Sequence, residues 1–175
     1  MHAADTIRPG EPGDLEAILR ILNHYILKTH HTFDTRPFAA EDKADWFARF
    51  STDGPLQLLL AETDGRVVGY AHSTPFRPKP AYDTTVETTV YIDPQHTGRG
   101  LGRRLLGDLL ERLADTEAHR AIGVIALPND ASLALHRRLG FEKIGVFSEA
   151  GFKLGRFWDV AWYQRSLSRM TGPGR

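Results

Sequence analysis

Apolar residues recur at two different spacings along this chain, and the change from one to the other predicts its elements. Near the N-terminus a short strand around Ile7 precedes a helix, for which Asp14 is the predicted N-cap. The helix has apolar residues three or four positions apart: Leu15, Ile18, Leu19, Leu22 and Ile26. Residues 28–40 have no clear period and are predicted to form a loop, and residues 41–50 a second short helix.

The middle of the chain carries patterns typical of strands. Two apolar runs within residues 57–73 are separated by Asp64-Gly65, a pair that favours a hairpin turn. A loop with three prolines follows at 75–83, and then the β-branched segment 84–92. Alternation along this segment places Thr85, Glu87, Thr89 and Tyr91 on one face, and Val86, Thr88, Val90 and Ile92 on the other.

Two more helices are predicted in the C-terminal half. The first has a wide apolar stripe and ends near Thr116. The stripe consists of Leu101, Leu105, Leu106, Leu109, Leu110 and Leu113. The second covers residues 130–139, with Asn129 as its N-cap and Gly140 as the residue that ends it.

The order of the elements predicts the fold class. A strand at 121–127 and two strands between 141 and 167 complete the series β-α-α-β-β-β-α-β-α-β-β. This series predicts an α/β (α+β) domain over residues 1–167, in which helices cover a mixed sheet. Residues 168–175 are predicted to form a disordered tail.

Composition narrows the function classes. A chain of 175 residues with 41% hydrophobic and 25% charged residues is typical of one globular domain. Lys plus Arg balances Asp plus Glu at 22 each, so any anion has to be recognised locally, and a nucleic-acid-binding module is disfavoured. The lack of cysteine excludes disulfides, thiolate metal sites and a cysteine nucleophile. With no signal-like segment and no apolar run of about 18 residues, we expect a cytoplasmic location and no membrane partner.

The segment DPQHTGRGLGRRLL, residues 93–106, places three glycines directly before the leucine-rich helix. Main-chain N–H groups at a helix N-terminus attract anions, and glycine lets a ligand approach the backbone closely. Arg99, Arg103 and Arg104 can add charge-assisted hydrogen bonds. The segment therefore indicates an anion site, with a glycine-rich turn that binds nothing as the alternative.

Two commoner phosphate loops fit this segment poorly. A Walker A loop needs Gly-Lys-Ser/Thr after its first glycine, and that sequence is absent. A dinucleotide fingerprint needs G-x-G-x-x-G and an acidic residue after the next strand, whereas here that strand ends in Leu127-Pro128.

The segment from Val90 to Gly102, together with Asn129 and the RLGF sequence at 138–141, resembles the GNAT superfamily of N-acetyltransferases. In that superfamily the glycine loop holds the pyrophosphate of acetyl-CoA, and the preceding strand binds the pantetheine arm. Thr97 departs from the pattern, because Gln or Arg is usual there. The resemblance implies cofactor contacts from Val90, Tyr91, Ile92, Gly98, Arg99, Gly100, Leu101, Gly102, Arg103 and Asn129.

The resemblance extends to one family, the phosphinothricin / methionine sulfoximine N-acetyltransferases. It rests on AYDTTVETTVYI, LPNDASLALHRRLGF and GRFWDVAWYQRSL, and runs from Ile7 to Leu167. It implies the GNAT fold, a mixed and mostly antiparallel central sheet flanked by helices. It also implies acetyl transfer from acetyl-CoA to the α-amino group of a small amino acid or analogue, without a metal, in a homodimer.

Candidate catalytic residues follow from the chemistry of amide formation. The attacking amine has to lose a proton, and the departing thiolate benefits from an acid. Glu87 is the candidate base, acting through water, because a carboxylate packs poorly in a β-branched strand and the family's proposed catalytic glutamate falls there. It can also be a solvent-facing residue or hold the ammonium. His136, seven residues after Asn129, is a second candidate for proton transfer, with a helix-surface histidine as the alternative. Tyr91 and Tyr82 are lesser candidates for the acid.

Candidate acceptor contacts lie on a basic loop and on the Glu87 strand. Arg77 and Lys79 can bind the carboxylate and the oxidised tail of an amino acid analogue, and Phe33 is a candidate wall of the pocket. His30 and His31 lack a third ligand nearby and do not predict a metal site. The resemblance implies substrate contacts from Arg77, Pro78, Lys79, Glu87, Thr88 and Thr89.

Two other functions remain open at this level. The same fold can acetylate a polyamine, an aminoglycoside or a protein N-terminus, although a basic FRPKP loop suits protein or polyamine acceptors poorly. A non-catalytic acyl-CoA sensor is the second alternative, and the presence of both Glu87 and His136 argues against it.

Overall fold

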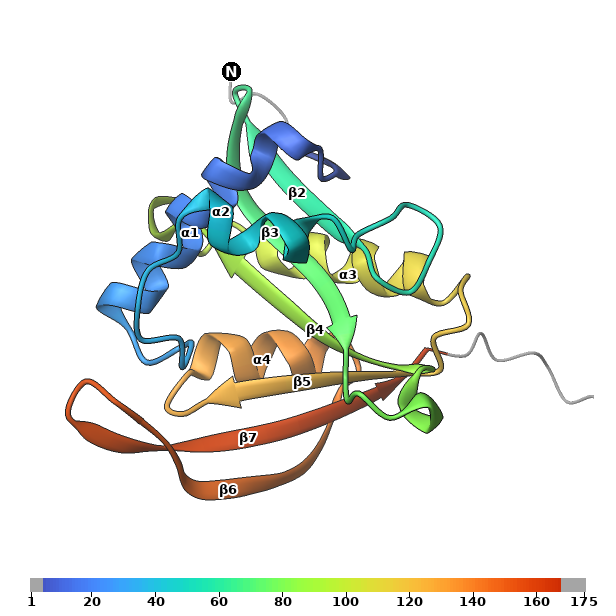
Figure 1. The fold of residues 1–175 in the computed structure, drawn as a ribbon. Helices are drawn as coiled ribbons and strands as arrows, with labels where there is room; N and C mark the ends of the chain where they lie inside the picture. Colours follow the sequence, from blue (N-terminus) through green and yellow to red (C-terminus); the bar gives the residue numbers. More distant parts are fainter. Residues whose placement is uncertain (1–4, 168–175) are drawn as a thin grey trace, which may run out of the picture.

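The computed structural model describes residues 5–167, and the tail predicted at 168–175 lies outside them. Within residues 5–167 the chain forms one seven-stranded sheet and four α-helices, in the predicted order (Figure 1). The strands are β1 (Thr6–Pro9), β2 (Leu58–Thr63), β3 (Arg66–Pro75), β4 (Thr85–Ile92), β5 (Arg120–Ala126), β6 (Glu142–Lys153) and β7 (Arg156–Ser166). The α-helices are α1 (Leu15–Lys28), α2 (Ala40–Phe47), α3 (Leu101–Leu113) and α4 (Asp130–Arg138), and short 3-10 helices lie at Pro12–Asp14, Pro80–Tyr82 and Pro94–His96.

The sheet is antiparallel except between β4 and β5, and its order is β1-β2-β3-β4-β5-β7-β6. β4 pairs with β3 as far as Ile92. Its pairing with β5 covers only Thr85–Glu87, opposite Arg120–Ile122. Beyond Glu87 the two strands separate, as Figure 1 shows, so the rest of this edge of β4 has no neighbouring strand within the described residues. The predicted mixed, mostly antiparallel sheet is confirmed.

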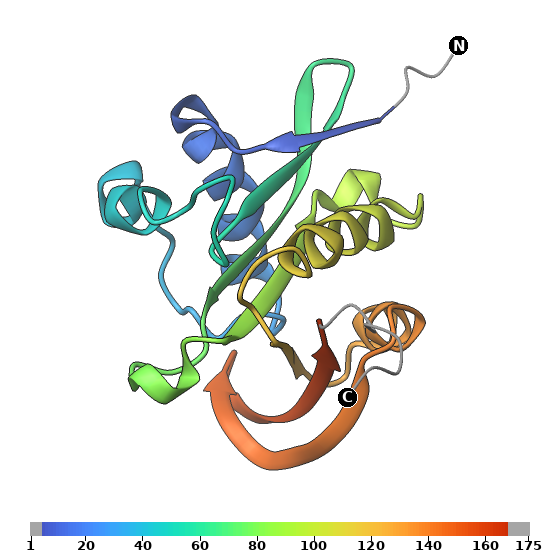
Figure 2. The same cartoon turned by 90° about the vertical axis from the view of Figure 1, so that its right-hand side faces the viewer.

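Helices cover both faces of the sheet, α1 and α2 on one side and α3 and α4 on the other (Figure 2). Alternation along β2 divides its side chains between the two cores. Leu58 and Leu60 belong to the core under α1, whereas Leu59 and Ala61 belong to the core under α3. The leucine stripe predicted on α3 is buried in full: Leu101, Leu105, Leu106, Leu109, Leu110 and Leu113.

The two predicted helix caps behave differently. The Asn129 side chain accepts a hydrogen bond from the Ser132 N–H at 3.2 Å, so this cap is confirmed. Asp14 occupies the N-cap position of α1, but its carboxylate makes no bond to that helix. It instead accepts two hydrogen bonds from Arg8, at 2.7 and 2.8 Å, and one from the Glu11 N–H. The predicted N-cap position is therefore confirmed, but the Asp14 side chain does not cap the helix, because the Arg8 guanidinium takes up its carboxylate.

Two helices end earlier than predicted. α2 ends at Phe47 and α3 at Leu113, short of Phe50 and Thr116. In both cases the chain continues into a tighter turn, with Phe50 N–H bonded to Phe47 and Thr116 N–H to Leu113 three residues earlier. Apolar spacing does not distinguish such a turn from another α-helical turn.

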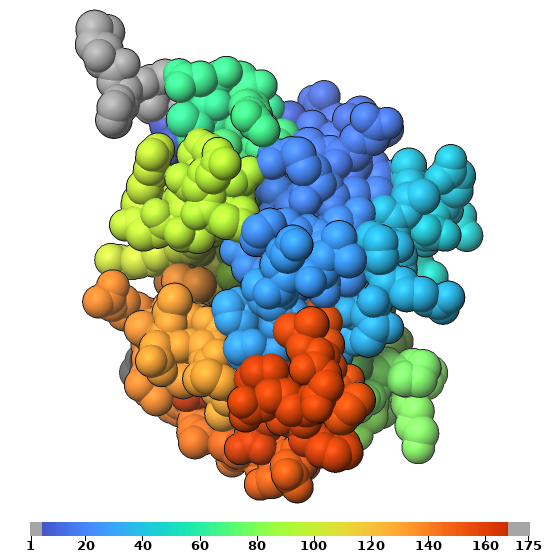
Figure 3. Space-filling model, turned by 90° about the vertical axis from the view of Figure 1, so that its left-hand side faces the viewer, coloured from blue at the N-terminus to red at the C-terminus, as the bar shows by residue number. Residues whose placement is uncertain are grey.

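The β6–β7 hairpin lies against the loop between α1 and α2 on the surface (Figure 3). The two segments are far apart in the sequence, since the Lys153 Nζ donates to the Thr32 carbonyl 121 positions away, at 2.7 Å. This contact joins the N-terminal and C-terminal parts of the chain beside the gap between β4 and β5.

Candidate active site

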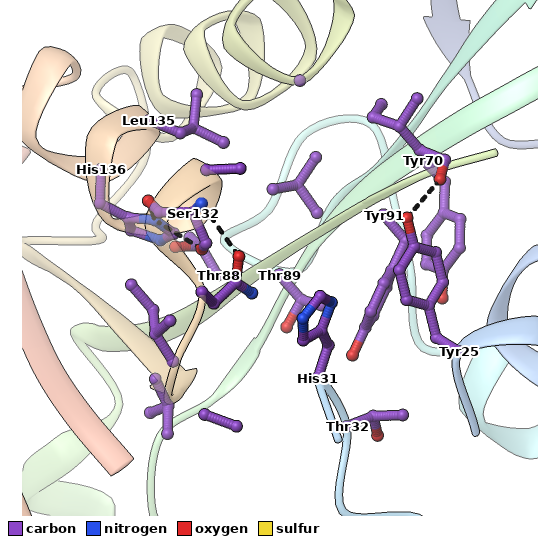
Figure 4. A pocket seen from close by; sticks show the side chains of 18 of the residues that line it. Tyr25, His31, Thr32, Tyr70, Thr88, Thr89, Tyr91, Ser132, Leu135 and His136 are labelled. Carbon is purple, nitrogen blue, oxygen red and sulfur yellow. Dashed lines mark hydrogen bonds between the residues drawn. The ribbon is translucent and has the colours of Figure 1, made fainter. Parts of the chain in front are cut away.

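A cavity of about 890 Å³ opens where β4 and β5 separate. One end is lined by the glycine loop and the start of α3, and the other by the loop between α1 and α2. Figure 4 shows its two walls, with Ser132 and His136 of α4 on one side and Tyr25, Tyr70 and Tyr91 on the other.

The glycine loop has the geometry of an anion cradle. Gly98 and Gly100 both have φ +78°, which favours glycine, and an added Cβ at either would meet only open space. Gly100 is the N-cap of α3, whose first N–H groups have no acceptor within the helix. Of the two arginines predicted to bind the cofactor, Arg103 lines the cavity and Arg99 does not.

Thr97 lines the same end of the cavity, but its hydroxyl is already engaged. It donates to the Pro94 carbonyl at 3.2 Å, within the loop itself. Thr97 is thus part of the loop's own structure, and Arg103 supplies a positive charge at this end of the cavity.

The unpaired end of β4 lies along the middle of the cavity, where Val90, Tyr91 and Ile92 all line it. The Tyr25 hydroxyl, from α1, donates to the Ile92 carbonyl at 2.7 Å. The Tyr91 ring packs against the rings of Tyr25 and Tyr70, with centroids 4.9 and 5.6 Å apart. Burial raises the pKa of Tyr91 to about 12, so this phenol keeps its proton at neutral pH.

Glu87 lies at the last residue pair between β4 and β5, opposite Ile122. Its half-buried side chain lines the cavity together with Thr88 and Thr89, although alternation puts Thr88 on the opposite face of the strand from the other two. Burial raises the pKa of the Glu87 carboxyl above its usual value, and the nearby Arg77 charge partly opposes this rise. A carboxyl with a raised pKa in a cavity is suited to accepting a proton.

His136 is a cavity residue rather than a helix-surface residue, because only 4% of it is exposed. Its Nδ1 lies 2.9 Å from the Ser132 carbonyl oxygen, which can only accept a hydrogen bond. The ring packs against Gly123 of β5, where an added Cβ would lie 2.6 Å from the imidazole. Burial lowers the pKa of His136, so the neutral ring predominates at pH 7.

The basic loop lies outside the cavity lining. Arg77, Pro78 and Lys79 are exposed, and the Arg77 guanidinium lies 4.9 Å from the Phe76 ring centroid. Arg77 still acts on the site, through the pKa of Glu87. Tyr82, a candidate acid, is also exposed and does not line the cavity.

Several cavity residues were not predicted from the sequence. Burial and the Lys43 charge lower the pKa of His72 to about 3, which keeps this histidine neutral beside the Trp46 ring. The loop at residues 28–40 has no periodic pattern that marks the residues facing the cavity, and only Phe33 was predicted to line it. The unpredicted lining residues include His31, Thr32, Asp34, Lys43, Trp46, His72 and Arg138.

The two adjacent histidines of this loop have partners other than a metal. The His30 ring stacks on the Trp158 ring, and its Nε2 lies 2.9 Å from the Pro128 carbonyl oxygen. The His31 ring stacks against Tyr25. Across residues 5–167, no group of three or more His, Asp or Glu side chains is placed to hold a metal ion.

Residues 18–141 match the acetyltransferase (GNAT) family. The chain belongs to this family. It is 48% identical over 164 residues to a phosphinothricin N-acetyltransferase of Streptomyces coelicolor, covering 92% of this chain and 95% of that relative. It is 33% identical over 168 residues to an L-methionine sulfoximine/L-methionine sulfone acetyltransferase of Salmonella typhimurium, covering 96% and 98%. A phosphinothricin acetyltransferase from Sinorhizobium meliloti, solved in complex with acetyl-CoA, has a TM-score of 0.90 at 33% identity, covering 97% of this chain and 92% of that one.

The chain is therefore an acetyl-CoA-dependent N-acetyltransferase, and acetyl-CoA is its co-substrate. The cavity fits this co-substrate: a glycine loop at a helix N-terminus suits the pyrophosphate, and an unpaired strand edge suits the amide groups of pantetheine. No helix within residues 5–167 is long and apolar enough to cross a membrane.

Proposed function

We propose that this enzyme acetylates the α-amino group of a small amino acid analogue of the phosphinothricin, methionine sulfoximine or methionine sulfone type. The names of relatives that match nearly the whole chain support this acceptor class. The observation that carries the proposal is the position of Glu87, a half-buried carboxyl in the cavity at the last pair before β4 and β5 separate.

The proposed reaction is a direct attack without a covalent enzyme intermediate. Glu87 accepts a proton from the acceptor's ammonium group through a water molecule, and the neutral nitrogen attacks the thioester carbonyl carbon. The carbon–sulfur bond of the tetrahedral intermediate then breaks, leaving the acetamide and the CoA thiolate. The nitrogen loses its second proton, and the thiolate takes up one.

His136 assists proton transfer in this proposal as an acceptor. Its Nδ1 carries the proton that is donated to the Ser132 carbonyl, so Nε2 of the neutral ring carries the lone pair. For the leaving thiolate, Tyr91 is the candidate acid, since it lines the cavity and carries a proton at neutral pH; its raised pKa makes that proton harder to donate. Tyr82 loses this role because it lies outside the lining.

We propose cofactor contacts from the lining residues of the glycine loop, β4 and α4, with Arg103 as the main cation. Arg99 is retained as a weaker contact, because it lies in the same loop but outside the lining. Acceptor contacts are proposed for Glu87, Thr88 and Thr89 in the cavity. Arg77, Pro78 and Lys79 remain proposed contacts from the neighbouring loop.

The test is release of free thiol from acetyl-CoA with a panel of amines, for wild type and Glu87→Gln. We expect turnover of the three amino acid analogues, and a kcat lower by about 10²-fold or more in Glu87→Gln, as for loss of a general base. Glu142→Gln, the same change at an exposed position of β6, should leave kcat unchanged. A wild type that acetylates polyamines or aminoglycosides but no amino acid analogue would overturn the acceptor class. An undiminished rate in Glu87→Gln would overturn the base.

We further propose that the enzyme is a homodimer formed through the β6–β7 hairpin. The exposed apolar side chains of the hairpin are Ile144, Val146, Phe147, Phe152, Leu154 and Phe157. A second copy is the simplest occupant, since pairing the same apolar surface on two copies is self-complementary and closed. Sedimentation velocity should show a dimer for wild type and a monomer for Phe152→Glu, and a wild-type monomer would overturn the proposal.

A further inference from the structure

The loop between α1 and α2 is attached to the β6–β7 hairpin, which lies beside it on the surface (Figure 3). We call residues 29–36 the strap. The His30 ring stacks on the Trp158 ring with centroids 3.9 Å apart and planes 5° apart. The buried Lys153 side chain donates from Nζ to the Thr32 carbonyl at 2.7 Å. The strap is thus held by an aromatic stack and by a charge-assisted hydrogen bond.

A third contact involves a glycine. The Phe33 ring lies directly over Gly151 of β6, and the ring edge is 2.3 Å from where a Cβ of residue 151 would be. Gly151 is not in the left-handed region, and it pairs with Trp158 within the sheet. Its backbone therefore does not require glycine. What requires glycine is the room that Phe33 occupies.

The strap also forms part of the cavity wall. His31, Thr32, Phe33 and Asp34 all line the cavity, and Phe33 is 37% exposed. The charges of both Asp34 and Glu87 raise the pKa of Tyr91. The strap and the proposed base therefore lie near the same tyrosine, at the end of the cavity away from the glycine loop.

We propose that Phe33 and Gly151 form a pair that determines which acceptor side chains the enzyme takes. Phe33 is the wall against which the acceptor's side chain ends, and Gly151, with Lys153 and Trp158, fixes the position of that wall from outside the cavity. The inference rests on the proposed function, in which the acceptor binds at the Glu87 end. Gly151, a residue of the hairpin outside the cavity lining, then helps to determine acceptor specificity.

The first test is Gly151→Ala. The added methyl group would displace the Phe33 ring from β6 toward the cavity and shorten the space for the acceptor's side chain. The ratio of kcat/KM for methionine sulfone to kcat/KM for alanine should then fall at least about tenfold, which is the discrimination that one methylene group produces in a hydrophobic pocket. The KM for acetyl-CoA should change less than about twofold, since the cofactor end is distant. Gly145→Ala is the matched control: Gly145 lies on the same strand, and an added Cβ there meets nothing within 4 Å.

The second test asks whether Gly151 acts through Phe33. Phe33→Ala removes the wall and should shift preference toward larger side chains, such as that of tryptophan. In the Phe33→Ala background, adding Gly151→Ala should then have no further effect on the ranking of acceptors. An effect of Gly151→Ala that persists without Phe33 would overturn the pairing, and so would an unchanged ranking in either single variant.

The design separates this inference from the proposed function. Acceptors are ranked by kcat/KM within whichever series of amines the wild type acetylates. If the wild type does not acetylate amino acid analogues, that result counts against the proposed function alone. Thermal unfolding of each variant checks that the fold is kept. Phe33→Ala only removes atoms from a partly exposed ring, so it keeps the inference testable if Gly151→Ala does not fold.

Discussion

The Nδ1 of His136 lies 2.9 Å from the carbonyl oxygen of Ser132, one helical turn earlier on α4. This bond fixes the neutral tautomer with its lone pair on Nε2. His136→Asn keeps a side-chain N–H group for Ser132 but loses the titratable nitrogen. We expect kcat to fall by about 10²-fold with little change in either KM, measured by steady-state kinetics. An unchanged kcat would reduce His136 to a packing residue.

Tyr25 holds the end of β4 through its bond to the Ile92 carbonyl. Tyr25→Phe removes only the hydroxyl, so the free energy of unfolding should fall by about 1 kcal/mol, and CoA should bind more weakly because the strand end is less fixed. Chemical denaturation and calorimetric titration with CoA measure the two effects. Tyr82→Phe, at an exposed tyrosine outside the cavity, is the control and should change neither.

Arg77 should set the acidic limb of the pH profile. Glu87 has to be ionised to act as a base, and the Arg77 charge lowers the Glu87 pKa that burial raises. Arg77→Gln should raise this pKa further, so the acidic limb of kcat moves to higher pH. Lys79→Gln is the matched control in the same loop. A limb that moves to lower pH in Arg77→Gln would contradict the assignment of the limb to Glu87.

The two arginines of the glycine loop should differ in their effect on acetyl-CoA. Arg103 lines the cavity, whereas Arg99 does not. Arg103→Ala should raise the KM for acetyl-CoA about tenfold or more, the loss expected for one charge-assisted hydrogen bond. Arg99→Ala should have a smaller effect. Equal effects would mean that the pyrophosphate lies closer to Arg99 than the cavity indicates.

The ion pair between Arg8 and Asp14 should make the free energy of unfolding depend on pH. Hydrogen bonds from Arg8 lower the pKa of Asp14 in the folded protein. The ion pair therefore contributes fully to the free energy of unfolding above the pKa of an unfolded aspartate, and this contribution is lost as the pH falls through the pKa of Asp14 in the folded protein. Asp14→Asn should lower the free energy of unfolding at pH 7 by about 1.5–3 kcal/mol. Urea unfolding should show the difference from wild type shrinking at acidic pH, and a constant difference would contradict the ion pair.

The predictable part of this molecule depended on local patterns. Alternation along β4 placed Glu87 and Thr88 on opposite faces, and the leucine stripe of α3 identified its buried face, because both follow from backbone geometry. The glycine loop was found because a strand, three glycines and a helix are consecutive in the sequence. Likewise, the side chain that caps α4 is Asn129, only three residues from its donor.

The unpredicted part depended on contacts between distant segments. The carboxylate of Asp14 is taken up by Arg8, which also bonds to Glu62, 54 positions away. The strap had no period from which to predict its structure. The strap is held at the cavity by two contacts with β6: Phe33 packs on Gly151, and Lys153 donates to the Thr32 carbonyl. β6 is far from the strap in the sequence, so local patterns could not predict these contacts.

The separation of β4 from β5 also divides the molecule mechanically. Four strands lie on one side of the gap and three on the other, and the ladder that joins them runs only from Thr85 to Glu87. A ligand that fills the gap and bonds to both walls acts in place of the missing rungs. If acetyl-CoA bonds to both walls, we expect it to stiffen the sheet as well as to supply the acetyl group.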